Sequence, residues 1–267
     1  MLDKHTKLLL HGWDGLVDAS MYNVPIVNFS GAVTVSSEVK FFGHPSLYFN
    51  GSSNLEFQDK SLIPDLGDWT VEWWENRPSF AASLGQFNAK YSDSNYTGIL
   101  LGHTSNGGYP YIYISNNGRN WNILEGAAVS NGKYVANTWI HWAYVRYGDA
   151  FSVFKNGTKV YTANITATTS FTGTGYSYYG SWSNGGKYLG YAADIRISDI
   201  ARYTADFEPL PEPFEDYMEY TFEDVAETGN SYYVRIFPMN KEKDYQTMLT
   251  NQTAYVSTGG TSGNVTI

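Results

Sequence analysis

The segment Trp139-Ile140-His141-Trp142-Ala143-Tyr144-Val145-Arg146-Tyr147 is the longest uninterrupted run of strand-forming residues in the chain. Aromatic and β-branched side chains favour extended backbone because they pack well on a pleated surface. Alternate side chains of a strand point to opposite faces, and in this run both sets are largely apolar. A strand with two apolar faces is covered on both sides, so we expect this one to lie centrally in a sheet.

A tight hairpin follows this strand. Asn156-Gly157 separates two apolar runs, Phe151–Lys155 and Lys159–Ala163. Asn-Gly in this position is a strong hairpin signal, because both central residues of the turn need a positive φ. Elsewhere short alternating runs are bounded by Gly, Asn, Asp and Ser, and helical periodicity is nearly absent, which predicts an all-β sandwich. The other expected strands are Lys7–His11, Ser46–Phe49, Asn54–Gln58, Trp69–Glu75, Gly98–Gly102, Pro110–Ser115, Trp121–Glu125 and Tyr188–Ser198.

Large aromatic side chains on these strands are the candidate core. Four indoles alternate with smaller side chains, and we expect them to fill the space between two sheets. His141 lies in the most apolar strand, which favours a hydrogen-bonded core histidine over a ligand for a metal. The four tryptophans are Trp69, Trp73, Trp139 and Trp142.

A proline-rich stretch marks a boundary near residue 208. The segment Phe207–Phe214 carries three prolines at alternate positions, and proline cannot donate to a strand ladder and extends the residue before it. Beyond it, Asp216–Phe222, Tyr232–Phe237 and Thr253–Ser257 are expected as strands of a small unit. We therefore predict a sandwich over residues 1–208, a stiff connector over 209–215, and a small β extension or the start of a further module over 216–267.

Composition excludes several classes of function. The chain has 267 residues, no cysteine and a formal net charge of −9, with a sequence pI of about 5.0. The absence of cysteine excludes thiolate zinc sites and disulfides, as in a protein that folds in a reducing cytoplasm. The acidic balance disfavours nucleic acid as a partner, because phosphate backbones are repelled. The first ten residues predict neither a signal peptide nor membrane insertion.

Several segments, in order over residues 7–214, are similar to one family. They resemble the laminin-G/concanavalin A-like domains found in bacteriophage tail and other virion proteins. The last of them, Ala201-Arg202-Tyr203-Thr204-Ala205-Asp206-Phe207, is typical of phage tail copies. The others are Leu8-Leu9-Leu10-His11-Gly12-Trp13-Asp14-Gly15 with Asp18-Ala19-Ser20, Ser46-Leu47-Tyr48-Phe49-Asn50-Gly51, Asp68-Trp69-Thr70-Val71-Glu72-Trp73-Trp74, and Thr138–Arg146 with the Asn156-Gly157 hairpin. In the second of these segments Asn50 replaces the usual Asp.

This resemblance implies a fold and a setting. The fold is a two-sheet antiparallel jelly-roll sandwich of the concanavalin A-like type, to which we add the small C-terminal β extension. The setting is the surface of a virion, on a tail fibre or head appendage. Such a protein is made in the host cytoplasm and becomes extracellular after lysis.

Catalysis is disfavoured although the family includes glycoside hydrolases. A retaining hydrolase holds two carboxyl groups about 5–5.5 Å apart, which on a strand requires acids two or four residues apart. The only close glutamate pair in a strong strand is Glu72 and Glu75, and a spacing of three places them on opposite faces. Neither a cysteine nor a nucleophile elbow is present. We expect a protein that is not an enzyme.

No cofactor is required by the sequence, but one calcium site is a candidate. Calcium takes six to eight oxygen ligands from carboxylates, amides and backbone carbonyls. Asp14 and Asp18 lie in one short loop, and Asp194 lies where the family usually carries an acid, so these three could converge on a structural calcium. The alternative is that Asp14 and Asp18 bond to their own backbone as turn residues, while Asp194 pairs with Arg196 or Arg202.

Two aromatic segments are candidate ligand sites. Sugars stack on rigid rings flanked by polar groups, and Tyr and Trp in a Gly/Ser-rich background have this character. We expect both to be loops: the first is Phe171–Lys187, and the second is Gly107–Trp121, which is partly strand. From the first we select Tyr176, Tyr178, Tyr179, Trp182 and Asn184, and from the second Tyr109, Tyr111 and Trp121.

The sequence supports two functions of different classes. The first is a non-catalytic binding module of a phage virion that recognises carbohydrate on a bacterial surface, with weak single contacts strengthened by many copies on one particle. The alternative is a structural or decoration protein that contacts only other virion subunits, through an exposed strand edge after Phe214. Assembly of the chain into a homo-oligomer is compatible with both.

Overall fold

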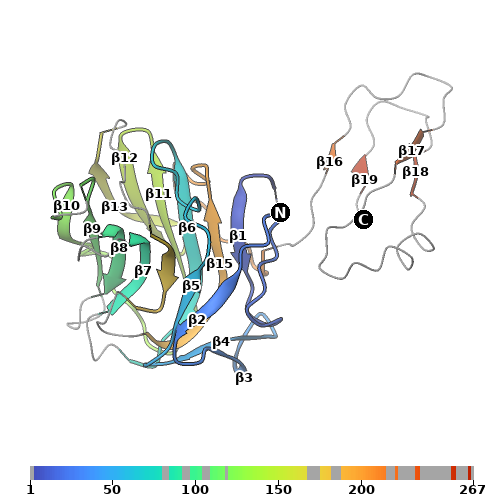
Figure 1. Cartoon of the computed structure of the whole chain (residues 1–267), viewed down its shortest axis with the longest axis horizontal. Coiled ribbons are helices and arrows are strands. Elements are labelled where there is room, and N and C mark those ends of the chain that lie inside the picture. Colours follow the sequence, from blue (N-terminus) through green and yellow to red (C-terminus); the bar gives the residue numbers. More distant parts are fainter. Residues whose placement is uncertain are drawn as a thin grey trace. The chain divides into compact units, whose positions relative to one another are not determined.

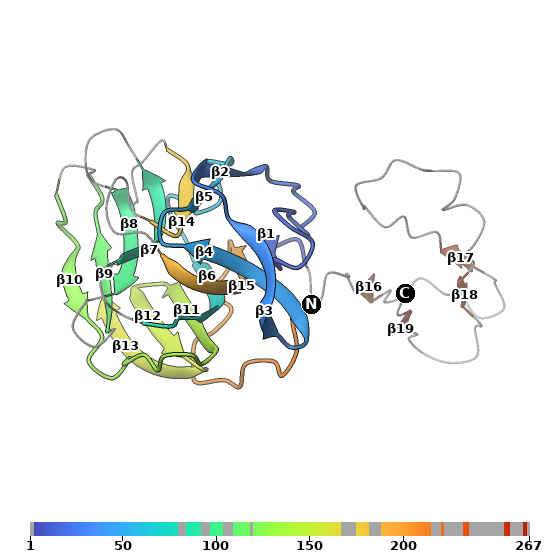
Figure 2. The ribbon, with the colours of Figure 1, turned by 90° about the horizontal axis from the view of Figure 1, so that it is seen from below.

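The computed structural model describes residues 3–79, 84–91, 97–103, 109–117, 120–166, 175–181 and 188–214, and four short strands between residues 220 and 265. All regular secondary structure in these residues is β, and the strands between residues 6 and 198 form two antiparallel sheets that pack as a sandwich (Figures 1 and 2). The all-β jelly-roll prediction is confirmed. In the described part of the chain no helix has the length and hydropathy needed to span a bilayer.

Sheet A has eight strands with β6 and β11 near its middle. β11 pairs with β6 on one side and with β12 on the other, and seven of its eight residues are buried. The predicted central strand is therefore confirmed. In sheet order the strands are β13 (Thr158–Asn164), β12 (Ala150–Lys155), β11 (Ile140–Tyr147), β6 (Trp69–Asn76), β15 (Leu189–Ser198), β4 (His44–Asn50) and β3 (Thr34–Phe41), and β1 (Thr6–Leu10) also pairs with β15.

Sheet B has seven strands and faces sheet A. Its strands come from four separate stretches of the chain, and β14 from the aromatic segment near residue 178 joins β5 to β7. In sheet order the strands are β10 (Leu124–Ala128), β9 (Pro110–Ile114), β8 (Thr97–His103), β7 (Leu84–Tyr91), β14 (Ser177–Tyr179), β5 (Asn54–Phe57) and β2 (Ile26–Ser30).

The core lies between the sheets and is rich in aromatic rings. Trp69, Trp73 and Trp142 are fully buried, as predicted. Trp73 stacks on Tyr144 from β11, with ring centroids 5.1 Å apart. The expectation for Trp139 was wrong, because this residue precedes the first residue of β11 and is only half-buried. Its indole Nε1 donates a hydrogen bond to the carbonyl oxygen of Lys40 (2.9 Å).

A bulge in β15 lets this strand change partners. β15 pairs with β4 as far as Ala192 and with β1 from Ile195 onward, while β6 lies along its other side. Asp194, which lies between Ala192 and Ile195, has φ +48°, a left-handed conformation that is uncommon for a residue other than glycine. The extra bulge residue bends the strand and turns the Asp194 carboxylate to a buried position.

The chain after β15 covers the outer face of sheet A. We call residues 199–214 the C-terminal strap. Ala201, Tyr203 and Phe207 of the strap pack on a buried apolar cluster formed by Ala143, Val145 and Phe154. The strap is also tied to the predicted hairpin turn, because the Phe207 N–H donates to the carbonyl oxygen of Gly157 (3.0 Å). The strap comes so close that a Cβ on Gly157 would lie 1.8 Å from the Phe207 oxygen, so only glycine is accommodated there.

The strap ends at Phe214, within the proline-rich stretch. Residues Lys4–Phe214 form one compact unit, so most of the segment predicted as a connector lies with the sandwich. The physical reason is Phe214, which is buried under the Arg196 guanidinium at 3.6 Å and whose N–H donates to Asp194 Oδ2 at 2.6 Å. A second unit holds residues 1–3 and 215–267. Its described strands pair as β16 (Tyr220–Thr221) with β19 (Asn264–Val265), and β17 (Tyr232–Val234) with β18 (Ala254–Val256).

Candidate functional site

The outer face of sheet B carries a row of side chains that crosses five neighbouring strands. In the strand register Glu56 lies opposite Tyr178, Tyr178 opposite Asn88, Asn88 opposite Leu100, and Leu100 opposite Tyr113. Directly opposite residues share a face of a sheet, so all five point the same way. Their neighbours along each strand belong to the core between the sheets, and the row therefore lies on the side away from sheet A.

Three aromatic rings gather at one end of this row. The Tyr113 ring lies 5.2 Å from Trp121 and 5.3 Å from Tyr111, the latter edge to face. All three rings are half-buried, and we call them the aromatic patch. Gly126 on β10 leaves space for the Tyr113 ring, since a Cβ there would lie 3.0 Å from its hydroxyl. Burial, followed by the neighbouring Tyr113, raises the pKa of Tyr111 to about 12, so its hydroxyl stays protonated at neutral pH.

An asparagine-rich loop borders the aromatic patch. The loop joins β9 to β10, and amide–amide hydrogen bonds link Asn122 to Asn116 (2.6 Å) and Asn117 to Asn120 (2.8 Å). Three of these four side chains are exposed. Each primary amide carries two donors and an acceptor, so the loop presents many polar groups beside the rings. Rings next to amides are the combination expected of a surface that binds sugars.

The other end of the row carries a carboxylate. The Tyr178 hydroxyl donates to Glu56 Oε2 (2.8 Å), and the Gln58 amide donates to Oε1 (3.1 Å). Phe29 from β2, with 55% of its surface exposed, meets the Tyr178 ring edge to face at 5.1 Å. Glu56 and Phe29 were missed in the sequence, because they come from strands far from the aromatic segments and only the sheet order brings them together.

The structure brings together some of the predicted ligand residues. Tyr111 and Trp121 belong to the aromatic patch, and Tyr178 lies in the same row across the sheet. Tyr176 and Tyr109 are half-buried just outside the strands, and the Lys60 ammonium lies 5.1 Å from the Tyr176 ring centroid. Trp182 and Asn184 lie outside the described residues.

Tyr179 is a correction to the predicted site. It alternates with Tyr178 on β14 and therefore points into the core, where it is fully buried. Its ring contacts Phe49 and Trp73, and the Gln86 amide donates to its hydroxyl at 2.7 Å. A segment expected to be a loop contains a strand, and the strand divides its adjacent tyrosines between the two faces.

The structure does not bring together the three aspartates of the predicted calcium site. Asp18 is buried and accepts four hydrogen bonds at its carboxylate, from the backbone N–H groups of Leu9, Ser20 and Val24 and from the Ser20 hydroxyl. Asp194 is held by His11 and Phe214, and Asp14 is exposed. Within the described part of the chain no three acidic or histidine side chains form a group suited to a metal.

We expect calcium to leave the stability of the sandwich unchanged. A ligand that binds only the folded state raises Tm by mass action, and the Asp18 oxygens already accept backbone donors. Thermal unfolding after chelation, with and without excess calcium, measures this directly. A rise in Tm that is lost in Asp14→Asn would restore the predicted site.

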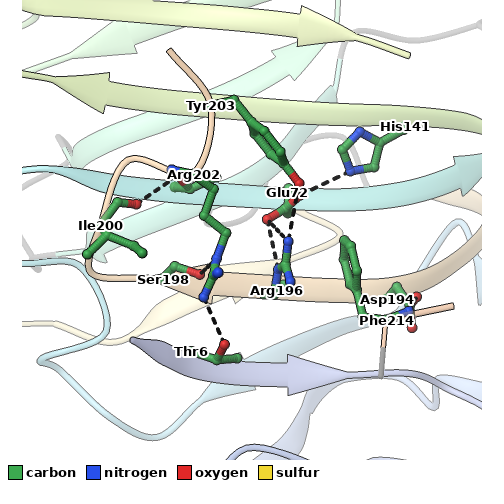
Figure 3. A network of polar contacts seen from close by, with 11 residues as sticks. Thr6, Glu72, His141, Asp194, Arg196, Ser198, Ile200, Arg202, Tyr203 and Phe214 are labelled. Atoms are coloured by element: carbon green, nitrogen blue, oxygen red, sulfur yellow. Dashed lines mark hydrogen bonds and ion pairs between the residues drawn. The ribbon is translucent and has the colours of Figure 1, made fainter. Parts of the chain in front are cut away.

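A second polar cluster lies under the strap on the outer face of sheet A (Figure 3). Glu72 of β6 is fully buried. Its Oε1 accepts from Arg196 at 2.8 Å, and its Oε2 from the Tyr203 hydroxyl at 2.8 Å and from His141 Nε2 at 3.1 Å. Burial alone would raise the pKa of Glu72, but Arg196 and His141 outweigh it and lower the pKa to about 2. The prediction of a hydrogen-bonded core histidine at His141 is confirmed.

The second glutamate of the pair points into the core. Glu75 is fully buried between the sheets beside Tyr188, Trp73 and Trp142, whereas Glu72 faces the strap. Burial raises the pKa of Glu75 to about 8, against the opposing effect of Arg77. The prediction of opposite faces is confirmed, so these two glutamates cannot act on one glycosidic bond.

Comparisons with known proteins agree with this architecture. Residues 49–206 match the family model for the concanavalin A-like lectin/glucanases superfamily. Domain 4 of the extracellular arabinanase AbnA from Geobacillus stearothermophilus, solved with arabinotriose, has 17% identity and a TM-score of 0.54 over 74% of this chain and 95% of that chain. A search of curated proteins found no match.

Toxin binding domains share the same fold. The binding domain of Paraclostridial mosquitocidal protein 1 has 12% identity and a TM-score of 0.56, over 74% of this chain and 50% of that chain. A structure from work on the cell entry of botulinum neurotoxin type C, which depends on two ganglioside molecules, has 14% identity and a TM-score of 0.53, over 74% and 48%. This chain thus spans about half of the toxin chains. Since the family model matches more than half of its residues, the chain belongs to the concanavalin A-like lectin/glucanases superfamily.

Proposed function

We propose that this chain is a non-catalytic carbohydrate-binding module, and that the outer face of sheet B is its ligand surface. The observation that carries the proposal is the aromatic patch, Tyr111, Tyr113 and Trp121, beside the asparagine loop. Aromatic rings offer a flat apolar surface to the C–H groups of a sugar, and amides bind its hydroxyls. Glu56 and Tyr178 add a carboxylate and a hydroxyl at the other end of the row, whereas Asn88 and Leu100 between the two ends are buried.

The arrangement of the two outer faces favours this surface. The strap covers the outer face of sheet A with Tyr203 and Phe207, and the acceptor oxygens of Glu72 are occupied there. Sheet B retains half-buried rings on its outer face. The known ligands of two proteins with this fold, arabinotriose and gangliosides, are also carbohydrates.

The finer proposal concerns the setting. The resemblance of Ala201–Phe207 to phage tail copies supports a role on a virion surface, where the module recognises glycans of a bacterial host. Many copies on one particle would turn weak contacts into firm attachment. Detection of the chain in purified particles by mass spectrometry, and saturable binding of the purified protein to host cells, test this. Binding to virion subunits alone would favour the decoration role.

Removal of two rings of the patch tests the ligand surface. We expect Tyr113→Ala with Trp121→Ala to weaken glycan binding by about 10- to 100-fold, because the stacking surface is lost. The parent is first screened on an array of arabino-oligosaccharides, gangliosides and bacterial surface polysaccharides, and affinities for its ligand are then measured by calorimetry. Tyr147→Ala, which removes an exposed ring at the β11–β12 turn, is the matched control. Equal affinity of parent and double variant, or no binding to any glycan, would refute the proposal.

A further inference from the structure

The turn between β3 and β4 holds a bulky residue in a strained conformation. Phe41 pairs with His44, so Phe42 and Gly43 are the two turn residues, with φ of +45° and +87°. Positive φ at both positions is the geometry of tight hairpins that Asn-Gly satisfies most easily. At a bulky side chain such as phenylalanine it is an outlier, and strain of this kind gathers at sites that bind ligands.

The Phe42 side chain is also exposed to solvent, and its ring packs against other aromatic rings. Phe42 has 45% of its surface exposed, and its ring lies 4.6 Å from Phe41 and 5.9 Å from Trp74. Phe41 is buried beneath it, 5.0 Å from Trp139, whose indole N–H is bonded to the backbone of Lys40. The hairpin therefore holds an exposed ring in a fixed position instead of burying it.

A second aromatic stack continues from the other side of the turn. The exposed His44 ring lies 4.6 Å from Trp13, and Trp13 stacks on His11 at 4.2 Å with an interplanar angle of 15°. His11 is buried, with Nδ1 2.6 Å from Asp194 Oδ1, so this stack is anchored in the fold. We call the rings around the turn the hairpin-tip surface: Trp13, Phe42, His44, Trp74 and Trp139.

We propose that the hairpin-tip surface is a second carbohydrate-binding site, at the edge of sheet A. It combines ring faces with polar groups, because the exposed side chains of Lys40 and His44 flank the rings and can bond to sugar hydroxyls. A purely apolar partner would not need these donors. The class of ligand rests on the proposed function, whereas the site itself shares no residue with the aromatic patch of sheet B.

Two sites on different sheets would let one chain hold two stretches of the same polysaccharide. The second contact is then intramolecular, and the apparent affinity for a long polymer exceeds that for a short oligosaccharide. β3 and β4 lie at one end of the strand order of sheet A, as Figure 2 shows, while Tyr111 and Tyr113 of the aromatic patch lie on β9 of sheet B. The advantage should therefore appear only with polymers long enough to reach both.

The substitution Phe42→Asn separates binding from stability. Asparagine accepts positive φ, so the relief of strain offsets the lost ring contacts, and we expect Tm to stay within about 4 °C of the parent. Binding to a polysaccharide that the parent recognises should weaken by about 10-fold or more. Thermal unfolding measures the first effect. Affinity electrophoresis with this polysaccharide, together with calorimetry on a trisaccharide fragment of it, measures the second. Tyr147→Ala is again the control for loss of an exposed ring.

The outcomes distinguish this inference from the proposed function. If Phe42→Asn binds the polysaccharide as the parent does, while Tyr113→Ala with Trp121→Ala loses binding, the hairpin tip is no glycan site and the sheet B surface stands. If Phe42→Asn alone loses binding, the hairpin tip is the principal site and the sheet B proposal fails. If the parent binds no glycan, both fall.

Discussion

Replacement of Glu72 by Gln is expected to destabilise the sandwich by about 3 to 5 kcal/mol at neutral pH. The carboxylate is fully buried and bonds to Arg196, His141 and the Tyr203 hydroxyl. The Arg196 guanidinium is itself buried, so the amide removes the charged carboxylate that bonds to this cation directly in a medium of low dielectric. Removal of one partner from a buried pair is costly because the other stays desolvated.

Chemical denaturation of parent and variant at pH 7 measures this loss. The matched control is Asp199→Asn, which breaks the partly exposed pair with Lys7 and should cost at most about 1 kcal/mol, since exposed pairs are screened by water. A Glu72→Gln variant within about 1 kcal/mol of the parent would mean that the network under the strap contributes little to stability.

Glu72 also makes the stability of the folded protein depend on pH in the acid range. The pKa of Glu72 falls from its usual 4.5 to about 2 in the folded state. Its contribution is therefore complete above pH 4.5 and is lost as pH falls toward 2, because the unfolded chain takes up the proton first. The parent should lose stability across this range by about 3 kcal/mol more than the variant does. Parallel acid titrations followed by tryptophan fluorescence would reveal the difference, and identical curves would contradict it.

The spacing of side chains along single strands could be predicted from the sequence. β11, the Asn156-Gly157 turn and the opposite faces of Glu72 and Glu75 all follow from a period of two residues, because a strand fixes the direction of each side chain locally. Tyr179 shows where this reasoning stops. Its segment is rich in Gly, Ser and Tyr and was interpreted as a loop, but three residues pair between β5 and β7 and turn the ring inward.

The ligand surface depends on contacts between distant segments. Glu56 and Tyr178 are separated by 122 positions, and only the insertion of β14 beside β5 joins them. Phe214 lay in an apparent linker, but the bulge at Asp194 presents a carboxylate to its N–H. Phe42 is no turn-former by composition, so its exposed position follows only from the pairing of Phe41 with His44. Sheet order, which local patterns do not specify, decides each of these.

Glu75 should make the protein sensitive to alkaline rather than acid conditions. Burial between the sheets raises the pKa of this carboxyl from 4.5 to about 8, although Arg77 acts in the opposite direction. The folded state therefore favours the neutral acid. The contribution of this group to stability is complete below pH 4.5 and declines as pH rises through about 8, because the unfolded chain releases the proton first.

We expect Glu75→Gln to be more stable than the parent at pH 9 by about 3 to 5 kcal/mol, and close to the parent at pH 4. The amide is neutral at every pH and nearly the same size as the protonated acid, so it removes the cost of a buried charge without leaving a cavity. Burial holds the pKa values of the neighbouring Tyr179 and Tyr188 well above their usual range, so these phenols stay neutral at pH 9 and do not obscure the effect.

Denaturant unfolding of both proteins at pH 4, 7 and 9 tests this, with Glu125→Gln as a control at an exposed glutamate. The difference between parent and Glu75→Gln should grow steadily with pH, whereas the control should track the parent. If the variant is instead less stable at pH 9, Glu75 is ionised and paired with Arg77 in the core. In that case the attraction of Arg77 would lower the pKa of Glu75 by more than burial raises it.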